Sequence, residues 1–258
     1  MKIIQIGNRK GGVGKTTTTN NLAWELVKAG KKVLSVDFDG QGNLTTMLLG
    51  DEPTKHWIGD VLLDHRFDIA AAIYPACIDG KIISNLDVIP GRSGDHMTKL
   101  DMEMISLTKR EERLSLQLKK LEHHYDYVLI DTNPGTSVLS LNAVTAADLY
   151  IIPTTYRDMS FDGIETFLQH VSDVRFIEED QINYVILRTA LKRASKRELE
   201  YGNSRIQAQW PNSVAKTVIW DRSVFGEAEL SRMPVSLFAP GHPAAAYYKD
   251  FAREIMNG

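Results

Sequence analysis

The sequence predicts an α/β protein with a mostly parallel, doubly wound sheet that carries helices on both faces. Short, nearly continuous apolar runs alternate along the chain with longer segments that have the periodicity of amphipathic helices. Strands without polar alternation are buried on both faces, and strands that alternate with helices form parallel sheets. A glycine-rich turn joins the first strand to the first helix, and α/β proteins bind many of their ligands at such strand ends.

The elements follow from these apolar runs and periodic segments. Strands are expected over residues 3–6, 32–37, 86–90, 127–131, 149–153, 183–187 and 214–219. Longer helices are expected over residues 17–29, 100–123, 163–176 and 244–256. Segment 51–85 is the least regular part of the chain.

Three local features refine the helical segments. Gly30 follows the first helix and is expected to cap its C-terminus. Asp162 precedes another periodic run and is expected to cap the N-terminus of that helix. The charged run 109–113 lies inside the pattern of the 100–123 segment, which predicts a solvated helix face with paired charges.

Composition and charge exclude several classes of protein. Of the 258 residues, 43% are hydrophobic and 24% are charged, which excludes a disordered chain, a collagen-like chain and a coiled coil. The net charge of −3 excludes a molecule that is basic throughout, so any contact with nucleic acid must come from a local patch. No apolar run approaches the ~18 residues of a membrane-spanning helix, so no membrane partner is expected.

Cysteine content and the lack of internal division complete this outline. The single cysteine, Cys77, cannot form an internal disulfide or a cysteine-rich metal site, and it suits a reducing, cytoplasmic location. No repeat, low-complexity tract or linker divides the chain. Residues 1–258 are therefore expected to form a single domain, without a helix-turn-helix domain ahead of the loop near residue 10.

The strongest signal for function is the glycine-rich loop between the first strand and the first helix. It contains Lys10, Gly11, Gly12, Val13, Gly14, Lys15, Thr16 and Thr17. Glycines let backbone N–H groups converge on an anion, and the following helix adds its N-terminal dipole. Lys15 supplies positive charge for the β- and γ-phosphates of a nucleotide, and the Thr16 hydroxyl can bind Mg²⁺. The alternative is a flexible glycine turn that contains Gly-Lys-Thr by chance.

Three aspartates are expected to complete the site. Asp37 and Asp39 follow the second strand, and Asp131 ends the strand 127–131. Because the carboxyl ends of the strands meet at one edge of the sheet, these carboxylates can approach a metal–phosphate centre there. A carboxylate after a hydrophobic strand is typical of the residue that holds Mg²⁺ through water. The alternative for the stretch around Asp37 and Asp39 is a solvent-exposed turn.

The loop and the aspartate segments resemble those of the ParA/MinD superfamily of ATPases. Arg9 occupies the first glycine position of an ordinary phosphate loop, and Lys10 is the leading lysine of the superfamily's deviant Walker A motif. Segment 37–43 is similar to its D-x-D-x-Q-G-N switch and segment 131–134 to its D-T-P-P sequence. Glycine at position 40 and asparagine at position 133 replace prolines common in the family.

The resemblance implies ATP and Mg²⁺ as cofactors and a catalytic role for three residues. Lys10 would reach across an ATP-sandwich homodimer to the phosphates of the partner, Lys15 would hold the phosphates of its own subunit, and Asp39 would orient or activate the attacking water. Asp37 would lie in the Mg²⁺ shell with Thr16 and Asp131. Family members are weak ATPases, which suits a molecular switch.

The C-terminal third contains a basic stretch. Residues 188–205 carry six basic and two acidic side chains, so this stretch has a charge of +4 and the rest of the chain −7. Such a stretch can contact a phosphate backbone without base recognition, whereas the alternative is an exposed helix with scattered charge. The resemblance favours non-specific DNA binding, and the candidate contacts are Lys192, Arg193, Lys196, Arg197 and Arg222.

The segment around Arg222 is similar to a family sequence of the form I-x-R-x-x-x-F-x-E-A, followed by P-V. The family places adenine contacts and part of its DNA-binding surface near that sequence. Arg188 and Thr189, after the strand 183–187, fall where residues of the adenine pocket lie in the family.

The function implied is partition of a plasmid or chromosome. The ATP-bound dimer would coat DNA at the nucleoid, and a centromere-binding adaptor protein would stimulate hydrolysis and release. The alternatives are an ATPase that positions a chemoreceptor cluster or a conjugation or secretion apparatus, a MinD-like membrane-cycling regulator, and a structural filament. The single cysteine argues against iron–sulfur relatives, and Asp250 and Glu254 in the last helix argue against a membrane-binding tail.

Overall fold

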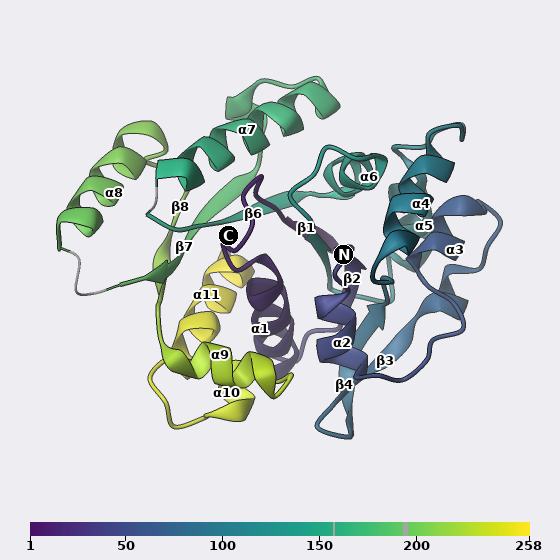
Figure 1. The fold of residues 1–258 in the computed structure, drawn as a ribbon, viewed down its shortest axis with the longest axis horizontal. Coiled ribbons are helices and arrows are strands. Elements are labelled where there is room, and N and C mark those ends of the chain that lie inside the picture. Colours follow the sequence, from purple (N-terminus) through teal and green to yellow (C-terminus); the bar gives the residue numbers. More distant parts are fainter. Residues whose placement is uncertain (157, 193–195) are drawn as a thin grey trace.

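The computed structural model describes residues 1–156, 158–192 and 196–258, and it has the predicted α/β architecture (Figure 1). An eight-stranded sheet has the order β3-β4-β2-β5-β1-β6-β7-β8. All neighbouring strands are parallel except β3 and β4. The strands are β1 Lys2–Ile6, β2 Val33–Phe38, β3 Tyr74–Ile78, β4 Lys81–Ile89, β5 Tyr127–Thr132, β6 Leu149–Thr154, β7 Tyr184–Leu191 and β8 Val214–Trp220.

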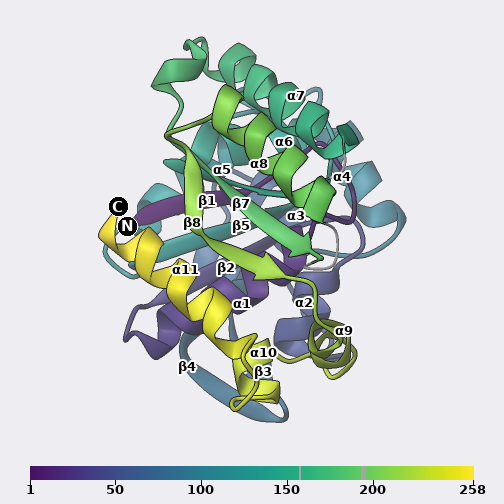
Figure 2. The ribbon, with the colours of Figure 1, turned by 90° about the vertical axis from the view of Figure 1, so that its left-hand side faces the viewer.

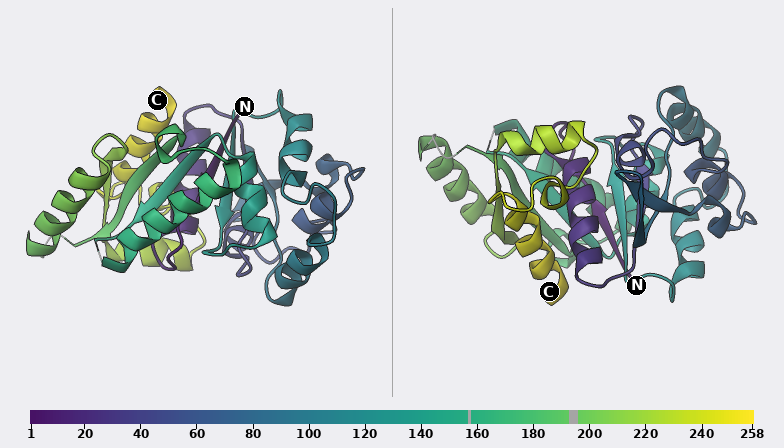
Figure 3. Two further views of the ribbon diagram at one scale, coloured as in Figure 1. Left: turned by 90° about the horizontal axis from the view of Figure 1, so that it is seen from above. Right: turned by 90° about the horizontal axis from the view of Figure 1, so that it is seen from below.

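Helices cover both faces of the sheet, as Figures 2 and 3 show. One face packs against α1, α2 and α11, and the other packs against α3 to α8. The helices are α1 Lys15–Lys28, α2 Asn43–Leu49, α3 Ile58–Leu63, α4 Asp95–Met104, α5 Arg113–Leu118, α6 Val138–Ala146, α7 Asp158–Arg175, α8 Lys196–Gln209, α9 Ser223–Leu230, α10 Val235–Phe238 and α11 Ala245–Asn257. In the described part of the chain, no helix is long and apolar enough to span a bilayer.

Strand β2 shows why the strands are almost purely apolar. Val33 packs in the core on the α1 face, whereas Leu34, Val36 and Phe38 pack in the core on the opposite face. Side chains alternate across a strand, so a strand in the middle of a two-sided sheet needs apolar residues at both parities. Each of the predicted strands overlaps a strand of the structure, so these predictions are confirmed.

The sequence analysis predicted only the second half of β4, over residues 86–90, and missed β3, the first half of β4 and the hairpin that joins them. Asp79 and Gly80 connect the two strands, and both have positive φ, 53° and 70°. Asp-Gly favours this two-residue turn, because its backbone twist matches that of the strands. The signal was thus present in the irregular segment 51–85.

The single helix expected over 100–123 is wrong. Helix α4 ends at Met104, and α5 begins only at Arg113. Lys109, between them, has φ +51°, which no α-helix accommodates. Segment 113–121 continues as α5 and a short 3₁₀ turn.

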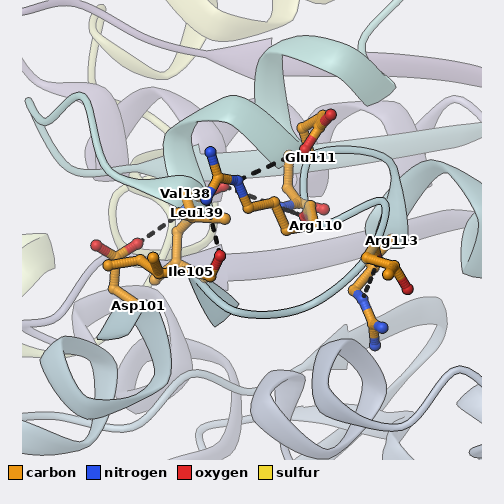
Figure 4. A network of polar contacts seen from close by, with 9 residues as sticks. Asp101, Ile105, Arg110, Glu111, Arg113, Val138 and Leu139 are labelled. Atoms are coloured by element: carbon orange, nitrogen blue, oxygen red, sulfur yellow. Dashed lines mark hydrogen bonds and ion pairs between the residues drawn. The ribbon is translucent and has the colours of Figure 1, made fainter. Parts of the chain in front are cut away.

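The charged run 109–113 does not form a helix face, although its charges are paired as predicted: Lys109 lies 3.6 Å from Glu112, and Arg110 lies 3.8 Å from Glu111. Its arginines also hold the helix break together (Figure 4). The Arg113 guanidinium donates to the carbonyls of Leu62 and Leu63 at 2.8 and 3.0 Å, and Arg110 donates to the carbonyl of Ile105 at 2.8 Å. These bonds satisfy carbonyls at helix ends, which have no partner within their own helices.

The two expected helix caps have opposite outcomes. Gly30 caps α1 as predicted, with φ +81° and N–H groups of Gly30 and Lys31 donating to the carbonyls of Val27 and Leu26. The N-cap expected at Asp162 is wrong, because α7 begins one turn earlier and Asp162 lies within it.

Candidate functional site

The glycine-rich loop turns sharply at the carboxyl end of β1 and leads directly into α1. Gly12 and Gly14 have φ of +72° and +83°, a conformation that costs glycine little and other residues much more. Val13 between them is buried, and its carbonyl accepts a hydrogen bond of 2.8 Å from the Thr189 hydroxyl. The loop is therefore tied to β7.

Asn8 fixes the beginning of the loop. Its side-chain amide donates to the Pro153 carbonyl at 2.8 Å, and its side-chain oxygen accepts from the Lys10 N–H at 2.8 Å. Gly163 of α7 packs against this turn, since a Cβ there would lie 2.5 Å from the Asn8 oxygen. The sequence analysis did not single out Asn8 or Gly163.

Lys15 is a buried cation at the first position of α1. Its ammonium donates to the Lys10 carbonyl at 3.1 Å, and only 7% of the residue is exposed. Burial lowers the pKa of Lys15, while the charges of Asp131 and Asp39 act in the opposite direction. An ammonium held in this way is a strong attractor for phosphate oxygens.

Asp131 and Asp37 lie side by side, because they are register partners on the parallel strands β5 and β2. The Asp131 carboxylate accepts hydrogen bonds from the hydroxyls of Thr16 and Thr19 at 2.6 and 3.2 Å. Burial, followed by the negative charge of Asp37, raises the pKa of Asp131 to about 8. Two buried carboxylates in one place are relieved by a cation, so the donor set fits Mg²⁺.

Asp37 holds the segment that follows β2. Its two oxygens accept from the Asp39 N–H at 3.0 Å and from the N–H and hydroxyl of Thr45 at 2.9 and 2.6 Å. Burial raises the pKa of Asp37 to about 6. Its place in a Mg²⁺ shell stays a prediction, because these contacts show it positioning segment 39–45.

A segment after β4 supports this arrangement and was missed by the sequence analysis. The Gly91 N–H donates to the Thr45 hydroxyl at 2.9 Å, and the Gly94 N–H donates to the Gly40 carbonyl at 3.1 Å. A Cβ on Gly91 would lie 2.8 Å from the Asp37 carbonyl oxygen, so only glycine fits there. The two glycines just after a predicted strand were the available signal.

A cavity of about 810 Å³ lies over the loop. Lys15 and Asp39 both line it, together with Gly11, Gly12, Gly14, Thr16, Thr17, Gly40, Gln41, Asn43, Gly94, Thr98, Asn133, Pro134 and Glu229. Asp39 keeps its orientation because one carboxylate oxygen accepts from the Gln41 N–H at 3.0 Å. Six of the eight predicted phosphate-binding residues thus meet Asp39 in one cavity, whereas Lys10 and Val13 are not among the residues that line it.

A smaller cavity of about 190 Å³ adjoins the other side of the loop. It is lined by Gly12, Val13, Gly14, Thr17, Thr189, Ala190, Ile219, Trp220, Asp221, Phe225 and Tyr248. Apolar and aromatic walls with a few polar groups suit a flat heterocyclic base. Thr189 lines this cavity, and its role as a residue of the adenine pocket stays a prediction.

Arg188 points elsewhere. Its guanidinium donates to the carbonyls of Ala215 and Lys216 at 2.7 and 3.1 Å, and it is not among the residues that line either cavity. Neighbouring residues of a strand face opposite sides, so Thr189 and Arg188 cannot both face the loop. A role for Arg188 in base binding stays a prediction that this geometry does not favour.

The described residues contain no group of three His, Cys, Asp or Glu side chains that could hold a metal ion on their own. Mg²⁺ commonly binds through one or two protein oxygens together with substrate phosphates. The Thr16 hydroxyl and the Asp131 carboxylate, 2.6 Å apart, are the protein oxygens that fit that pattern here.

The predicted DNA contacts fall in two places along the chain, one in residues 192–197 and the other at Arg222. Lys192 follows β7, Lys196 and Arg197 begin α8, and all three are exposed. Arg222 precedes α9 and is half-buried. Arg193 lies outside the described residues.

Arg205 contributes to the charge count of the basic stretch but has acidic neighbours in α7. Its guanidinium lies 3.4 Å from Asp162 and 3.9 Å from Glu165. The positive charge that segment 188–205 offers to a ligand is therefore smaller than its sequence suggests.

Comparison with known proteins identifies the family. The family model described as an AAA domain matches residues 1–184, which include the loop and all three aspartates. Over 260 residues the chain is 33% identical to the sporulation initiation inhibitor protein Soj of Bacillus subtilis, with 100% of this chain and 99% of Soj covered. The chain belongs to the ParA/MinD family of ATPases.

Two further relatives agree with this membership. The chromosome partitioning protein ParA of Caulobacter vibrioides is 30% identical, with 100% of this chain and 94% of that protein covered. Cobyrinic acid a,c-diamide synthase from Mycobacterium smegmatis, solved with a bound ATP analogue and magnesium, is 25% identical and has a TM-score of 0.80. That match covers 99% of this chain and 94% of the synthase, which confirms the predicted fold class.

Proposed function

We propose that this member of the ParA/MinD family is an ATPase that partitions plasmid or chromosomal DNA. The observation that carries the proposal is the meeting of Lys15 and Asp39 in the cavity over the glycine loop, beside the buried pair of Asp131 and Thr16. ATP and Mg²⁺ are the cofactors that suit this set of groups.

The chemistry expected is transfer of the γ-phosphoryl group to water, which needs charge neutralisation and a positioned nucleophile. Lys15 holds the phosphates, and Lys10 reaches those of the second subunit. Thr16, Asp131 and Asp37 would hold Mg²⁺, which would supply positive charge at the phosphates. Asp39 orients the attacking water. The intrinsic turnover is slow, because the switch is completed only with a partner.

The ATP-bound form is a homodimer that binds DNA without sequence preference, and an adaptor protein bound at the centromere stimulates hydrolysis. The exposed side chains of Lys192, Lys196 and Arg197 support the DNA contact. The relatives named for sporulation control and chromosome partitioning support the cellular role. The protein would act in the cytoplasm, at the nucleoid.

DNA binding in different nucleotide states tests this function. Two duplexes of unrelated sequence are titrated with the protein in ADP, in ATP and in a non-hydrolysable ATP analogue. We expect both duplexes to bind equally, and only with ATP or the analogue. The Asp39→Ala variant should bind ATP and DNA yet release phosphate at least ~100-fold more slowly, since the attacking water has lost its positioning group. Equal DNA binding in ADP and ATP, or normal turnover by Asp39→Ala, would contradict the proposal.

A further inference from the structure

The two places predicted to contact DNA lie next to each other in the fold. Strands β7 and β8 are parallel neighbours that end side by side (Figure 2). Beyond their last register pair, the Asp221 N–H donates to the Leu191 carbonyl at 2.9 Å. Lys192 directly follows one partner of this hydrogen bond, and Arg222 directly follows the other. A single backbone contact therefore joins the two segments that carry these basic residues.

The small cavity beside the glycine loop reaches the same two segments. Its walls include Thr189 and Ala190 from β7, together with Trp220, Asp221 and Phe225 from the end of β8 and the chain that follows it. On both strands, the wall of this cavity thus comes within two residues of a predicted DNA contact.

Strand β7 is irregular where it borders the cavity. Ala190 has φ +51°, in the left-handed region that residues other than glycine rarely adopt. The register with β8 shifts between Arg188 and Leu191, where β7 has one residue more than its neighbour. Such a bulge bends a strand and redirects the side chains near it. The conformation at Ala190 therefore determines how the chain continues toward Lys192.

The turn after β8 is held by the aromatic wall of the cavity. The Phe225 N–H donates to the Arg222 carbonyl at 3.1 Å, and the Phe225 ring meets the Tyr248 ring edge-on, with 6.1 Å between their centroids. Tyr248 also lines the cavity, and its hydroxyl lies 3.1 Å from the Thr18 hydroxyl of α1. Arg222 is thus linked through Phe225 to a wall that is anchored on α1.

A flat base that fills this cavity gives both segments packing partners, and a ligand favours the conformation with which it makes the better contacts. We propose that the base of bound ATP positions Lys192 and Arg222 for DNA by packing against residues 189–190 and 220–225. The inference rests on the proposed function, because it concerns the DNA contact of the ATP-bound form. The γ-phosphate is then needed for the dimer, and the base is needed for the DNA contacts of each subunit.

Amide hydrogen exchange tests this packing without DNA. The N–H groups of Asp221 and Phe225 report on the two hydrogen bonds described above. We expect ADP and a non-hydrolysable ATP analogue to slow their exchange at least about tenfold relative to the nucleotide-free protein, because both ligands carry the base. Magnesium tripolyphosphate offers the glycine loop phosphates without a base, so it should leave the exchange within about twofold of the nucleotide-free rate.

Two controls accompany the exchange measurement. Displacement of a fluorescent ATP analogue shows that tripolyphosphate occupies the glycine loop. The Ile177 N–H donates to the Ser172 carbonyl at 3.3 Å, and neither residue lines the cavity, so its exchange should be the same in every state.

A pair of substitutions at residue 221 tests the DNA contact itself. Asp221→Pro and Asp221→Ala both remove the carboxylate, but only proline removes the N–H that donates to the Leu191 carbonyl. With a saturating ATP analogue, we expect Asp221→Pro to bind DNA at least about tenfold more weakly than Asp221→Ala, because the segments of Lys192 and Arg222 are no longer joined. The affinities of the two variants for the analogue should agree within about threefold.

The outcomes separate this inference from the proposed function. Wild-type protein that binds DNA equally in ADP and in the ATP analogue would overturn the proposed function and this inference with it. Where DNA binding does require the analogue, three results overturn this inference alone: ADP does not slow exchange at Asp221 and Phe225, tripolyphosphate slows it as much as ADP does, or the two variants bind DNA equally. If Asp221→Pro does not fold, the exchange measurements on the wild type decide. If tripolyphosphate does not bind, the ADP measurement and the two variants decide.

Discussion

Two charged regions of this molecule differ in whether their charged side chains are buried or exposed. At the carboxyl ends of β1, β2 and β5, Lys15, Asp37 and Asp131 are buried, and each forms at least one hydrogen bond. On the outer surface of segment 188–205, Lys192, Lys196 and Arg197 are exposed. A charge kept out of water needs a compensating partner, whereas an exposed charge is tolerated almost anywhere.

This difference decides how far each region can be interpreted. Removing a charge from water costs several kcal/mol unless a partner compensates it, so the buried set indicates a ligand of defined chemistry. Exposed pairs contribute about 0–1 kcal/mol, and counting them says little. Within the basic stretch, Arg188 donates to backbone carbonyls and Arg205 lies beside Asp162, so their positive charges are already compensated within the protein.

The largest effect is expected from Lys15→Ala, which should abolish the buried cation of the first region. ATP affinity should fall at least ~100-fold, because truncating one partner of a buried charge pair costs about 2–5 kcal/mol. ATP-dependent DNA binding should be lost with it, although the DNA surface is untouched. Equilibrium binding of a fluorescent ATP analogue measures the first effect, with Lys31→Ala as the control. Retained micromolar binding would remove Lys15 from the site.

A smaller effect is expected when the second region is neutralised. Changing Lys192, Arg193, Lys196 and Arg197 to glutamine should weaken DNA binding about tenfold or more and leave ATP binding unchanged. The slope of log K against log salt should become less negative by about 0.9 for each DNA phosphate that the variant no longer neutralises.

Arg205→Gln sharpens that experiment, because Arg205 belongs to the same basic stretch but lies beside Asp162 and Glu165. We expect it to leave the salt dependence unchanged. If the quadruple variant keeps the wild-type slope, or Arg205→Gln alone flattens it, then the DNA surface lies elsewhere and the distinction between the two kinds of basic residue fails.

The same contrast explains what could be predicted from the sequence. The glycine loop and the three aspartates were predictable, because their positions relative to the strands define the site. Thr19, Thr45 and Gly91 were not predictable. Thr19 donates a hydrogen bond to Asp131, Thr45 donates to Asp37, and Gly91 donates to Thr45. Sheet register and loop packing bring these residues to the site, and no local spacing encodes that.

Fold prediction failed where local signals competed. The apolar pattern continued from residue 100 to 121, yet the backbone of Lys109 is left-handed and interrupts the helix. Arg113 and Arg110 donate hydrogen bonds to carbonyls at the C-terminal ends of α3 and α4. The spacing of apolar residues indicates which face of a segment is buried, but it does not reveal a break in the helix. At Asp79-Gly80 the turn signal was present, but the flanking strands were too irregular to be recognised.

The smallest effect concerns how the buried carboxylates of the first region respond to pH in the nucleotide-free protein. The pKa values of Asp131 and Asp37 in the folded protein are about 8 and about 6, above the ordinary value of 3.8. The folded state therefore holds these protons more tightly than the unfolded state. Their contribution to stability is full below about pH 4 and declines as the pH rises through 6 and then 8.

Asp131→Asn keeps the shape of the protonated residue but cannot ionise, so it should remove the upper part of this decline. We expect the melting temperature of the variant to exceed that of wild type by ~2–4 °C at pH 8.5, a difference of about 1 kcal/mol for a chain of this size. The two melting curves should converge near pH 5, where Asp131 of the wild type is protonated. Calorimetry across this range measures the effect, and Asp95→Asn at an exposed position is the control.

With ATP and Mg²⁺ present the order of the two melting temperatures should reverse, because the carboxylate then has a cation to bind. A variant that melts below wild type at pH 8.5 without nucleotide would show that the ionised Asp131 stabilises the empty site, and the contrast between strained buried charges and relaxed exposed ones would not hold.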